Sequence, residues 1–397
     1  DTDRFHIVAE LNDAAWRPVA AMVGEEETEL VFIHEVIARI IAQAARQTGL
    51  SVVVRELLTF EGNEFYFAPA DSLAGRTYGE ALFAFDDAEP VGIRTAEGVT
   101  LNPPPDQHIG ATDDLVVLAE DDVHITRTDD DGDLSAAARG VDDAMLVAPV
   151  PPVAEPEHLL ILGWSPRAPL IICTLNAYLE PGSTITVVTV REDAEAELAV
   201  QCAGLTNLTV AFQPGDPTDR ALLNRLGIEG FDHVVVMSRS HAAPQAADTH
   251  ALVTLLHLRD LAEQHGSAFN IVSEMNDVRN QALAEVTRAD DFVVSDRLIS
   301  LMVAQIAEKR QLADVFTELF SPVGAELYLR PASDYVVTGR PIPFYAVVEA
   351  ARRRNETALG FRRGSDAYER NGLHLNPRGS APVTFTADDR VILLANS

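Results

Sequence analysis

One seven-residue stretch occurs twice in this chain of 397 residues, as IVAELND at residues 7–13 and as IVSEMND at residues 271–277. Five of the seven letters are identical and stand in the same order. The similarity continues without gaps, since residues 33–69 align with residues 295–331 and 12 of these 37 positions are identical. Ordered similarity over such a length indicates that the chain contains two copies of one structural unit.

The repeat reaches the end of the chain. The tripeptide LNP occurs at residues 101–103 and again at residues 375–377, in the same order relative to the earlier matches. We call residues 1–126 the first copy and residues 158–397 the second copy. The chain is therefore a tandem duplication, and a fold proposed for one copy has to suit the other.

The second copy opens with strands and helices in alternation. Apolar, β-branched runs predict strands at residues 158–163, 183–190, 208–216, 232–238 and 269–277. Helical spacing of apolar residues predicts helices at residues 167–179, 192–204, 219–227 and 247–266. Strands separated by helices form βαβ units, so we predict an α/β fold with a Rossmann-like, doubly wound parallel sheet.

The first copy begins only at the last strands of the same lobe. A sheet cut at this point has an unpaired edge, so we expect the chain to be a fragment of a longer protein. A segment supplied by another chain is the alternative.

Each lobe is followed by an apolar helix, at residues 35–47 and 297–309. Both helices are apolar over much of their circumference. Burial in the core of one lobe explains this pattern, and so does a dimer interface. The candidate interface residues are Ile37, Ile41, Ile299 and Val303.

Short strands follow each helix and predict a small mixed α+β domain, which we call a C-lobe. The acidic and then Pro-rich stretch between the copies reads as a linker. The predicted boundaries are 1–60 for the end of the first lobe with its helix, 61–126 for the first C-lobe, 127–157 for the linker, 158–323 for the second lobe with its helix, and 324–397 for the second C-lobe.

The chain is strongly acidic. It has 61 acidic and 30 basic residues, which gives a formal net charge of −31. Nucleic-acid backbones and anionic lipid surfaces require a basic face, so the charge argues against both kinds of partner. Only two cysteines are present, Cys173 and Cys202. We expect neither a disulfide framework nor a metal cluster from them, and a reducing compartment. No apolar run reaches the roughly 18 residues of a membrane helix, and no signal peptide opens the chain, so we expect the chain as given to be soluble.

The first strand–helix turn of the second copy, LGWSPRA, lacks the glycines of a dinucleotide fingerprint. Gly163 holds the first position, but Ser165 and Ala168 replace the others, and Pro166 removes an N–H donor. We therefore expect no conventional NAD site. A degenerate pocket remains, either for a smaller ligand or for none, and its candidate residues are Gly163, Trp164, Ser165, Arg167, Arg191, Glu192, Gly215 and Asp216. Asp219 is expected to cap the following helix.

No residue pattern indicates catalysis, so we expect a protein that is not an enzyme. Four acidic residues at matched strand ends are candidate Ca²⁺ ligands, namely Glu10, Asp13, Glu274 and Asp277. Helix capping by Asp13 and Asp277 is the alternative reading.

The order of these features resembles RCK (TrkA-type) domains. The stretches GIEGFDHVVVMS, ADTHALVTLLHLRDL and LFSPVGAELYLRP in the second copy, with HEVIARIIAQAARQTGL and ELLTFEGNEFYF in the first, are similar to the CASTOR/POLLUX family of ion channels. The similarity covers nearly the whole chain apart from the linker.

The resemblance implies tandem RCK domains that assemble as a homotetrameric gating ring, on the cytoplasmic face of a membrane, below a transmembrane pore of the same protein. It also implies that ion or small-ligand binding, with Ca²⁺ as a possible ligand, controls a K⁺- or Ca²⁺-conducting pore. A regulatory RCK subunit of a potassium transporter and an NAD-dependent oxidoreductase are the alternatives.

Overall fold

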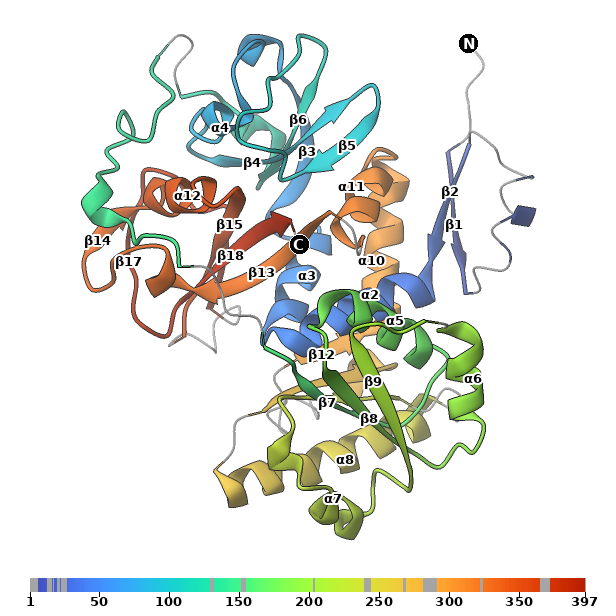
Figure 1. The fold of residues 1–397 in the computed structure, drawn as a ribbon. Coiled ribbons are helices and arrows are strands. Elements are labelled where there is room, and N and C mark those ends of the chain that lie inside the picture. Colours follow the sequence, from blue (N-terminus) through green and yellow to red (C-terminus); the bar gives the residue numbers. More distant parts are fainter. Residues whose placement is uncertain are drawn as a thin grey trace. The chain divides into compact units, whose positions relative to one another are not determined.

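The structure is a computed structural model. It describes residues 6–12, 16, 18–19, 22, 27–128, 132–150, 155–202, 204–238, 244–266, 269–280, 291–321, 324–364 and 372–396. The chain divides into two compact units. Unit 1 consists of Asp1–Val54 and Val153–Arg310, and unit 2 consists of Arg55–Pro152 and Gln311–Ser397. Each unit thus contains part of both copies (Figure 1).

Unit 1 is built on a six-stranded parallel sheet with strand order β12-β11-β10-β7-β8-β9. The strands are β7 (His158–Leu162), β8 (Ser183–Thr189), β9 (Leu208–Pro214), β10 (His233–Val236), β11 (Asn270–Met275) and β12 (Asp291–Val294). The connecting helices are α5 (Ala168–Tyr178), α6 (Ala194–Gln201), α7 (Arg220–Leu226) and α8 (Pro244–His265). This topology confirms the predicted doubly wound α/β fold. Its strand order reverses between β7 and β10, which is where ligands bind in such sheets.

The first copy contributes a two-stranded parallel sheet to unit 1, formed by β1 (Ile7–Leu11) and β2 (Thr28–Phe32). Val8 pairs with Glu29 there, and Val272 pairs with Asp291 at the corresponding positions of β11 and β12. The repeat in sequence is therefore also a repeat in strand register.

The helices that follow these strands pack across the two copies. Helix α2 (Ile33–Arg46) belongs to the first copy but packs against β10, β11, β12 and α5 of the second. Helix α10 (Ser295–Glu308) belongs to the second copy and packs against β1 as well as β12. This exchange explains why both helices are apolar over so much of their surface. Ile37, Ile41 and Ile299 are buried, and Val303 is half-buried.

Unit 2 holds two four-stranded antiparallel sheets, one from each copy, with orders β3-β6-β4-β5 and β13-β18-β15-β16. Their strands are β3 (Glu64–Pro69), β4 (Ala88–Thr95), β5 (Gly98–Leu101), β6 (Asp114–Ala119), β13 (Ala325–Pro331), β15 (Glu356–Arg362), β16 (Leu373–Leu375) and β18 (Arg390–Asn396). The pair β14 (Pro341–Pro343) and β17 (Pro382–Thr384) forms a further small sheet. Unit 2 also contains the helices α4 (Tyr78–Ala81), α11 (Leu312–Leu319) and α12 (Tyr345–Arg352), and α3 (Leu50–Leu58) contributes residues to both units.

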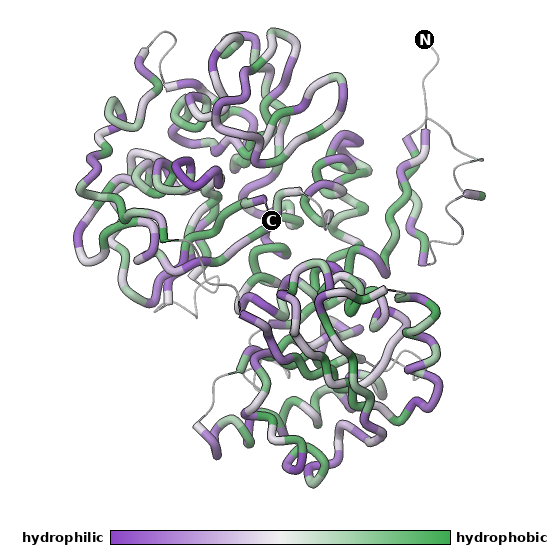
Figure 2. The backbone as a smooth tube through the Cα atoms, viewed as in Figure 1, coloured by the Kyte–Doolittle hydropathy of each residue, from purple (hydrophilic) through white to green (hydrophobic). Residues whose placement is uncertain are grey.

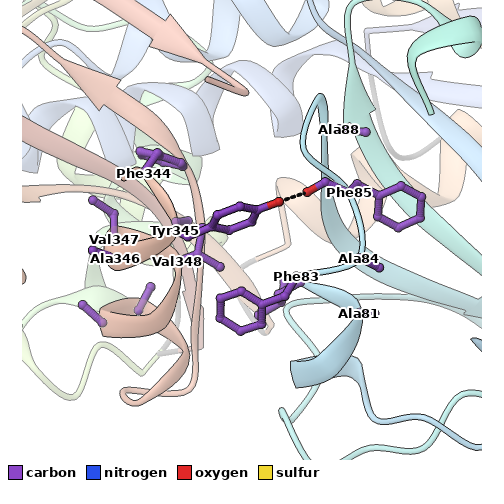
Figure 3. Close-up of a cluster of buried hydrophobic side chains, with 14 of the residues drawn as sticks. Ala81, Phe83, Ala84, Phe85, Ala88, Phe344, Tyr345, Ala346, Val347 and Val348 are labelled. Atoms are coloured by element: carbon purple, nitrogen blue, oxygen red, sulfur yellow. Dashed lines mark hydrogen bonds between the residues drawn. The ribbon is translucent and has the colours of Figure 1, made fainter. Parts of the chain in front are cut away.

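A single hydrophobic cluster joins the two C-lobes. Figure 3 shows Tyr345 of the second copy pointing toward the first, where its hydroxyl donates to the Phe85 carbonyl oxygen at 2.6 Å. The rings of Phe83 and Tyr345 lie 5.8 Å apart between centroids. Figure 2 colours the backbone by hydropathy and shows hydrophobic colour along many inner segments and hydrophilic colour on many outer turns. The copies therefore share one core in unit 2.

Much of the segment predicted as a linker makes defined contacts with unit 2. Leu134 is buried in the shared cluster. The Val147 N–H donates to the Tyr335 carbonyl at 2.9 Å, and the Val337 N–H donates to the Met145 carbonyl at 3.0 Å. Apolar side chains inside an otherwise polar stretch explain why these residues pack instead of extending as free chain.

Candidate functional site

The turn after β7 lies at the switch point of the six-stranded sheet and is the centre of the candidate site. Gly163 has a φ of +101°, and a Cβ there would lie 2.9 Å from the Met237 carbonyl oxygen. Only glycine satisfies both conditions without strain. The glycine that resembles the start of a dinucleotide fingerprint therefore serves a close approach between β7 and the end of β10.

The next residues fold inward. Trp164 is 6% exposed, its Nε1 donates to Glu197 Oε2 at 3.1 Å, and its ring centroid lies 5.9 Å from that of Phe212. Ser165 is 1% exposed, and its hydroxyl accepts from the Arg167 N–H at 3.2 Å. A large indole and a closed Ser turn thus occupy the place where a phosphate-binding turn presents free N–H groups.

Arg167, at the end of the turn after β7, forms an ion pair with Glu274 of β11. The Glu274 side chain is fully buried, and that of Arg167 is 14% exposed. Burial raises the pKa of Glu274, and the Arg167 guanidinium opposes this shift. Within the described part of the chain, Arg167 Nε and Glu274 Oε2 are buried atoms that lack a hydrogen-bond partner. They are the atoms that a ligand or a water would satisfy.

A buried aspartate on α8 makes hydrogen bonds to the turn after β11. Asp248 on α8 is fully buried and accepts from the Asn276 and Asp277 N–H groups, both at 3.0 Å, and from Asn280 Nδ2 at 2.9 Å. Asn276 Nδ2 also donates to the Ser238 hydroxyl at 2.5 Å. Asp248 therefore fixes the turn after β11, a role that we did not predict because its partners lie about 30 positions away.

The other candidate ligand residues make local contacts at the ends of β8 and β9. Arg191 pairs with Asp193 at 2.6 Å and with Glu197 at 3.0 Å, while Glu192 is exposed. Asp216 accepts from the N–H and the hydroxyl of Thr218, at 3.0 and 2.8 Å.

Gly215 lies so close to Leu222 that a Cβ would meet its Cδ2 at 2.3 Å. Asp219 caps α7 through the Ala221 N–H at 2.9 Å, as predicted. The structure thus joins Arg167 to Glu274 and leaves these residues in separate turns.

The candidate Ca²⁺ ligands are not brought together in the described residues. Glu10 is exposed at the end of β1, whereas Glu274 pairs with Arg167. Asp277 pairs with Arg279 at 2.6 Å, and that partner lowers its pKa. Asp13 lies outside the described residues. Across the described ranges no group of three His, Cys, Asp or Glu is placed to hold a metal ion, so Ca²⁺ binding by these residues stays a prediction.

The two cysteines depart from our expectation. Cys173 on α5 and Cys202 just after α6 form a disulfide in the structure. We predicted no disulfide because 29 residues separate them and no Cys spacing pattern was present. The prediction was wrong because the two helices are neighbours on the same side of the sheet, which brings the two Cα atoms to 5.8 Å.

None of the described helices is long and apolar enough to cross a membrane. A pocket of 370 Å³ lies in unit 1 beside the Gly163–Arg167 turn. Its lining residues are Asn12, Phe32, His34, Glu35, Pro166, Leu170 and Gln201.

Comparisons with known proteins place this geometry in context. Residues 34–133 match a family model described as Castor and Pollux, part of voltage-gated ion channel. The probable ion channel POLLUX of Oryza sativa subsp. japonica is 30% identical over 432 residues, an alignment that covers 99% of this chain and 44% of that protein. The probable ion channel CASTOR of the same organism is 30% identical over 397 residues, covering 90% of this chain and 44% of that protein.

The chain thus spans less than half the length of these two relatives. Among solved structures, the human SLO3 gating ring has a similar fold, with a TM-score of 0.71 and 14% sequence identity. That comparison covers 98% of this chain and 81% of the other. The sequence matches confirm the predicted resemblance to the CASTOR/POLLUX family, and the structural match confirms the predicted Rossmann-like α/β fold.

Proposed function

We propose that this chain, which is related in sequence to the CASTOR and POLLUX ion channels over nearly its whole length, is the regulatory gating-ring region of a cation channel. The observation that carries the proposal is the coincidence of two independent similarities. The named relatives are ion channels, and the fold of the chain is that of a gating ring. The pore, the membrane and the other ring subunits are parts of this proposal.

The site supports a role in binding. The turns at the switch point contain a buried ion pair, a buried indole and a closed Ser turn, which are groups that can hold and orient a ligand. The same features disfavour an oxidoreductase, since Ser165 places a Cβ where a dinucleotide fingerprint needs glycine and Pro166 has no N–H to donate.

The exchanged helices suggest how the region works. Because α2 packs on the sheet of the other copy, a ligand that moves that sheet also moves the first copy. A ligand that binds one arrangement of the copies more tightly than another shifts the population toward it. A rigid connection to a pore would convert that shift into opening or closing.

The test combines mass and thermal stability. We expect light scattering to show assembly of the chain toward a tetramer. We also expect Ca²⁺, a monovalent cation or a nucleotide to raise the melting temperature, with Mg²⁺ at matched ionic strength as the control for Ca²⁺. A ligand at about 100 times its dissociation constant stabilises by roughly 2.7 kcal/mol, a shift of about 5–10 °C. A chain that stays monomeric and unaffected by all these ligands would contradict the proposal.

A further inference from the structure

The disulfide joins two helices that both border the candidate site. Cys173 lies in the middle of α5, the helix that begins directly after the Gly163–Arg167 turn. Cys202 lies at the end of α6, the helix that follows β8. These are the only cysteines of the chain, so no other thiol of the same chain competes for either partner.

Helix α6 contributes few side chains to the hydrophobic core. It is 8 residues long, and only Ala194 and Leu198 are buried. An isolated helix of this length is unstable, so its order comes from packing. The link from Cys202 to Cys173 fixes the carboxyl end of α6.

The same helix holds the two turns of the site. Glu197 on α6 accepts from Trp164 Nε1 at 3.1 Å and pairs with Arg191 at 3.0 Å. Trp164 lies in the turn after β7, and Arg191 lies in the turn after β8. A displacement of α6 therefore pulls on both turns through one carboxylate.

Small thiols have a route to the bond. Cys173 is half-buried and not enclosed. Leu170, one helical turn before Cys173, and Gln201, the neighbour of Cys202, both line the 370 Å³ pocket beside the site. An accessible disulfide is open to thiol exchange, whereas a fully enclosed one is not.

We propose that Cys173 and Cys202 form a redox-sensitive clamp that locks α6 onto α5 when oxidised and releases α6, with Glu197, when reduced. The co-reactant is a low-molecular-weight thiol such as glutathione. Its thiolate attacks one protein sulfur, forms a mixed disulfide and releases the other cysteine as a thiolate, which takes up a proton. A second glutathione thiolate then attacks the mixed disulfide. Two glutathione thiols become one glutathione disulfide, and the protein disulfide gains two electrons and two protons. The inference rests on unit 1 alone and holds whichever ligand the site binds.

The test follows the full chain in glutathione buffers of defined oxidised-to-reduced ratio. We expect alkylation under denaturing conditions to label no thiol in the oxidised protein and two in the reduced protein. Reduction should lower the melting temperature of unit 1 by roughly 5–10 °C, because the bond closes a loop of about 30 residues. Hydrogen exchange of residues 194–201 should rise on reduction.

A spectroscopic readout connects the clamp to the site. In a Trp16→Phe variant, Trp164 is the single tryptophan, and its emission should change on reduction because its bond to Glu197 loosens. The control is the same variant carrying Cys173→Ser, whose emission and melting temperature should not depend on the redox buffer. Two alkylated thiols in every buffer, or a disulfide whose reduction changes neither exchange in α6 nor Trp164 emission, would overturn the proposal.

Discussion

The repeated LNP motif makes matching contacts in the two copies of unit 2, whereas the matched acids of unit 1 make different ones. Asn102 and Asn376 of the repeated LNP motif have φ values of 45° and 46°. Each donates its Nδ2 to a backbone carbonyl of the other copy, Asn102 to Asn355 at 3.0 Å and Asn376 to Asp87 at 2.9 Å. This reciprocal pair of bonds makes the C-lobes two halves of one interface.

The matched acids of unit 1 have no such symmetry. Glu274 is buried and paired with Arg167, but its counterpart Glu10 is exposed. Asp291 is 1% exposed and accepts from the Gly49 and Ser51 N–H groups at the start of α3, at 2.5 and 2.9 Å. Its counterpart Glu29 pairs instead with Arg310 near the surface. Matched residues thus make similar contacts at the LNP motif of unit 2 and different contacts in the sheets of unit 1.

The largest difference between matched positions should be at Glu274 and Glu10. A Glu274→Leu change leaves the Arg167 guanidinium buried without its partner, which costs about 3–5 kcal/mol. Glu10→Leu, at the exposed counterpart, should change the free energy of unfolding by less than about 0.5 kcal/mol. Urea denaturation of both variants measures the two values. Equal small losses would show that the buried ion pair does not stabilise unit 1.

A second contrast concerns Glu89 and Thr357, which lie at matched positions of β4 and β15. The Thr357 hydroxyl bonds to Asn102 and Tyr78. The Glu89 carboxyl is buried, and within the described residues its Oε1 has no hydrogen-bond partner. Burial raises the pKa of Glu89 well above its ordinary value.

This raised pKa has a consequence for the pH dependence of unit 2. Above the ordinary Glu pKa of about 4.3, the unfolded chain loses the proton that folded Glu89 keeps. Stability therefore falls as pH rises toward the folded pKa, by about 1.4 kcal/mol per pH unit. The Gln side chain of a Glu89→Gln variant cannot titrate. The free energy of unfolding of the variant should therefore increase relative to that of the wild-type protein between pH 5 and 7. A difference in the free energy of unfolding between the two proteins that stays constant from pH 5 to 7 would contradict the expectation.

We expect a smaller contrast between Asp291 and its counterpart Glu29. Asp291→Ala removes a buried carboxylate that accepts two backbone bonds, so we expect a loss of about 2 kcal/mol. Glu29→Ala breaks a partly exposed pair with Arg310 and should cost about 0.5 kcal/mol or less. Urea denaturation of both variants at one temperature measures the two changes in the free energy of unfolding. If Glu29→Ala lowered the free energy of unfolding as much as Asp291→Ala, the two matched acids would contribute equally to stability despite their different burial.

The smallest expected effect tests the symmetry of the LNP motif. Asn102→Gly keeps the left-handed backbone but removes the bonds to Asn355 and Thr357, and we expect a loss of about 1 kcal/mol. Asn376→Gly should give a similar loss, because its bond to Asp87 is the counterpart. Asn102→Ala, as the control for conformation, should cost more since alanine disfavours the positive φ. Unequal losses for the two glycine variants would show that the interface is not reciprocal in energy.

Much of the fold was predictable from local pattern. Strand β7 was expected at 158–163 and lies at His158–Leu162, and helix α5 was expected at 167–179 and lies at Ala168–Tyr178. The Asp219 cap needed only the residues beside it. Such features depend on contacts between near neighbours, so their signal is carried by short stretches of sequence.

The site was less predictable because its partners come from distant segments. Arg167 and Glu274 were both candidates, but for different ligands, and nothing in their spacing of 107 positions joins them. The pairing of Cys173 with Cys202 was missed for the same reason, and so was the role of Asp248.

By itself the sequence determined the duplication, the alternation of strands and helices, and the resemblance to the CASTOR/POLLUX family, because repeated motifs and hydrophobic periodicity can be recognised without knowledge of the fold. Only the tertiary structure decided what the cleft contains. The parallel sheet brings the carboxyl ends of β7 and β11 to one edge, where burial makes an unpaired charge costly and so joins Glu274 to Arg167. It also sets α5 beside α6, which brings Cys173 and Cys202 close enough to form a disulfide.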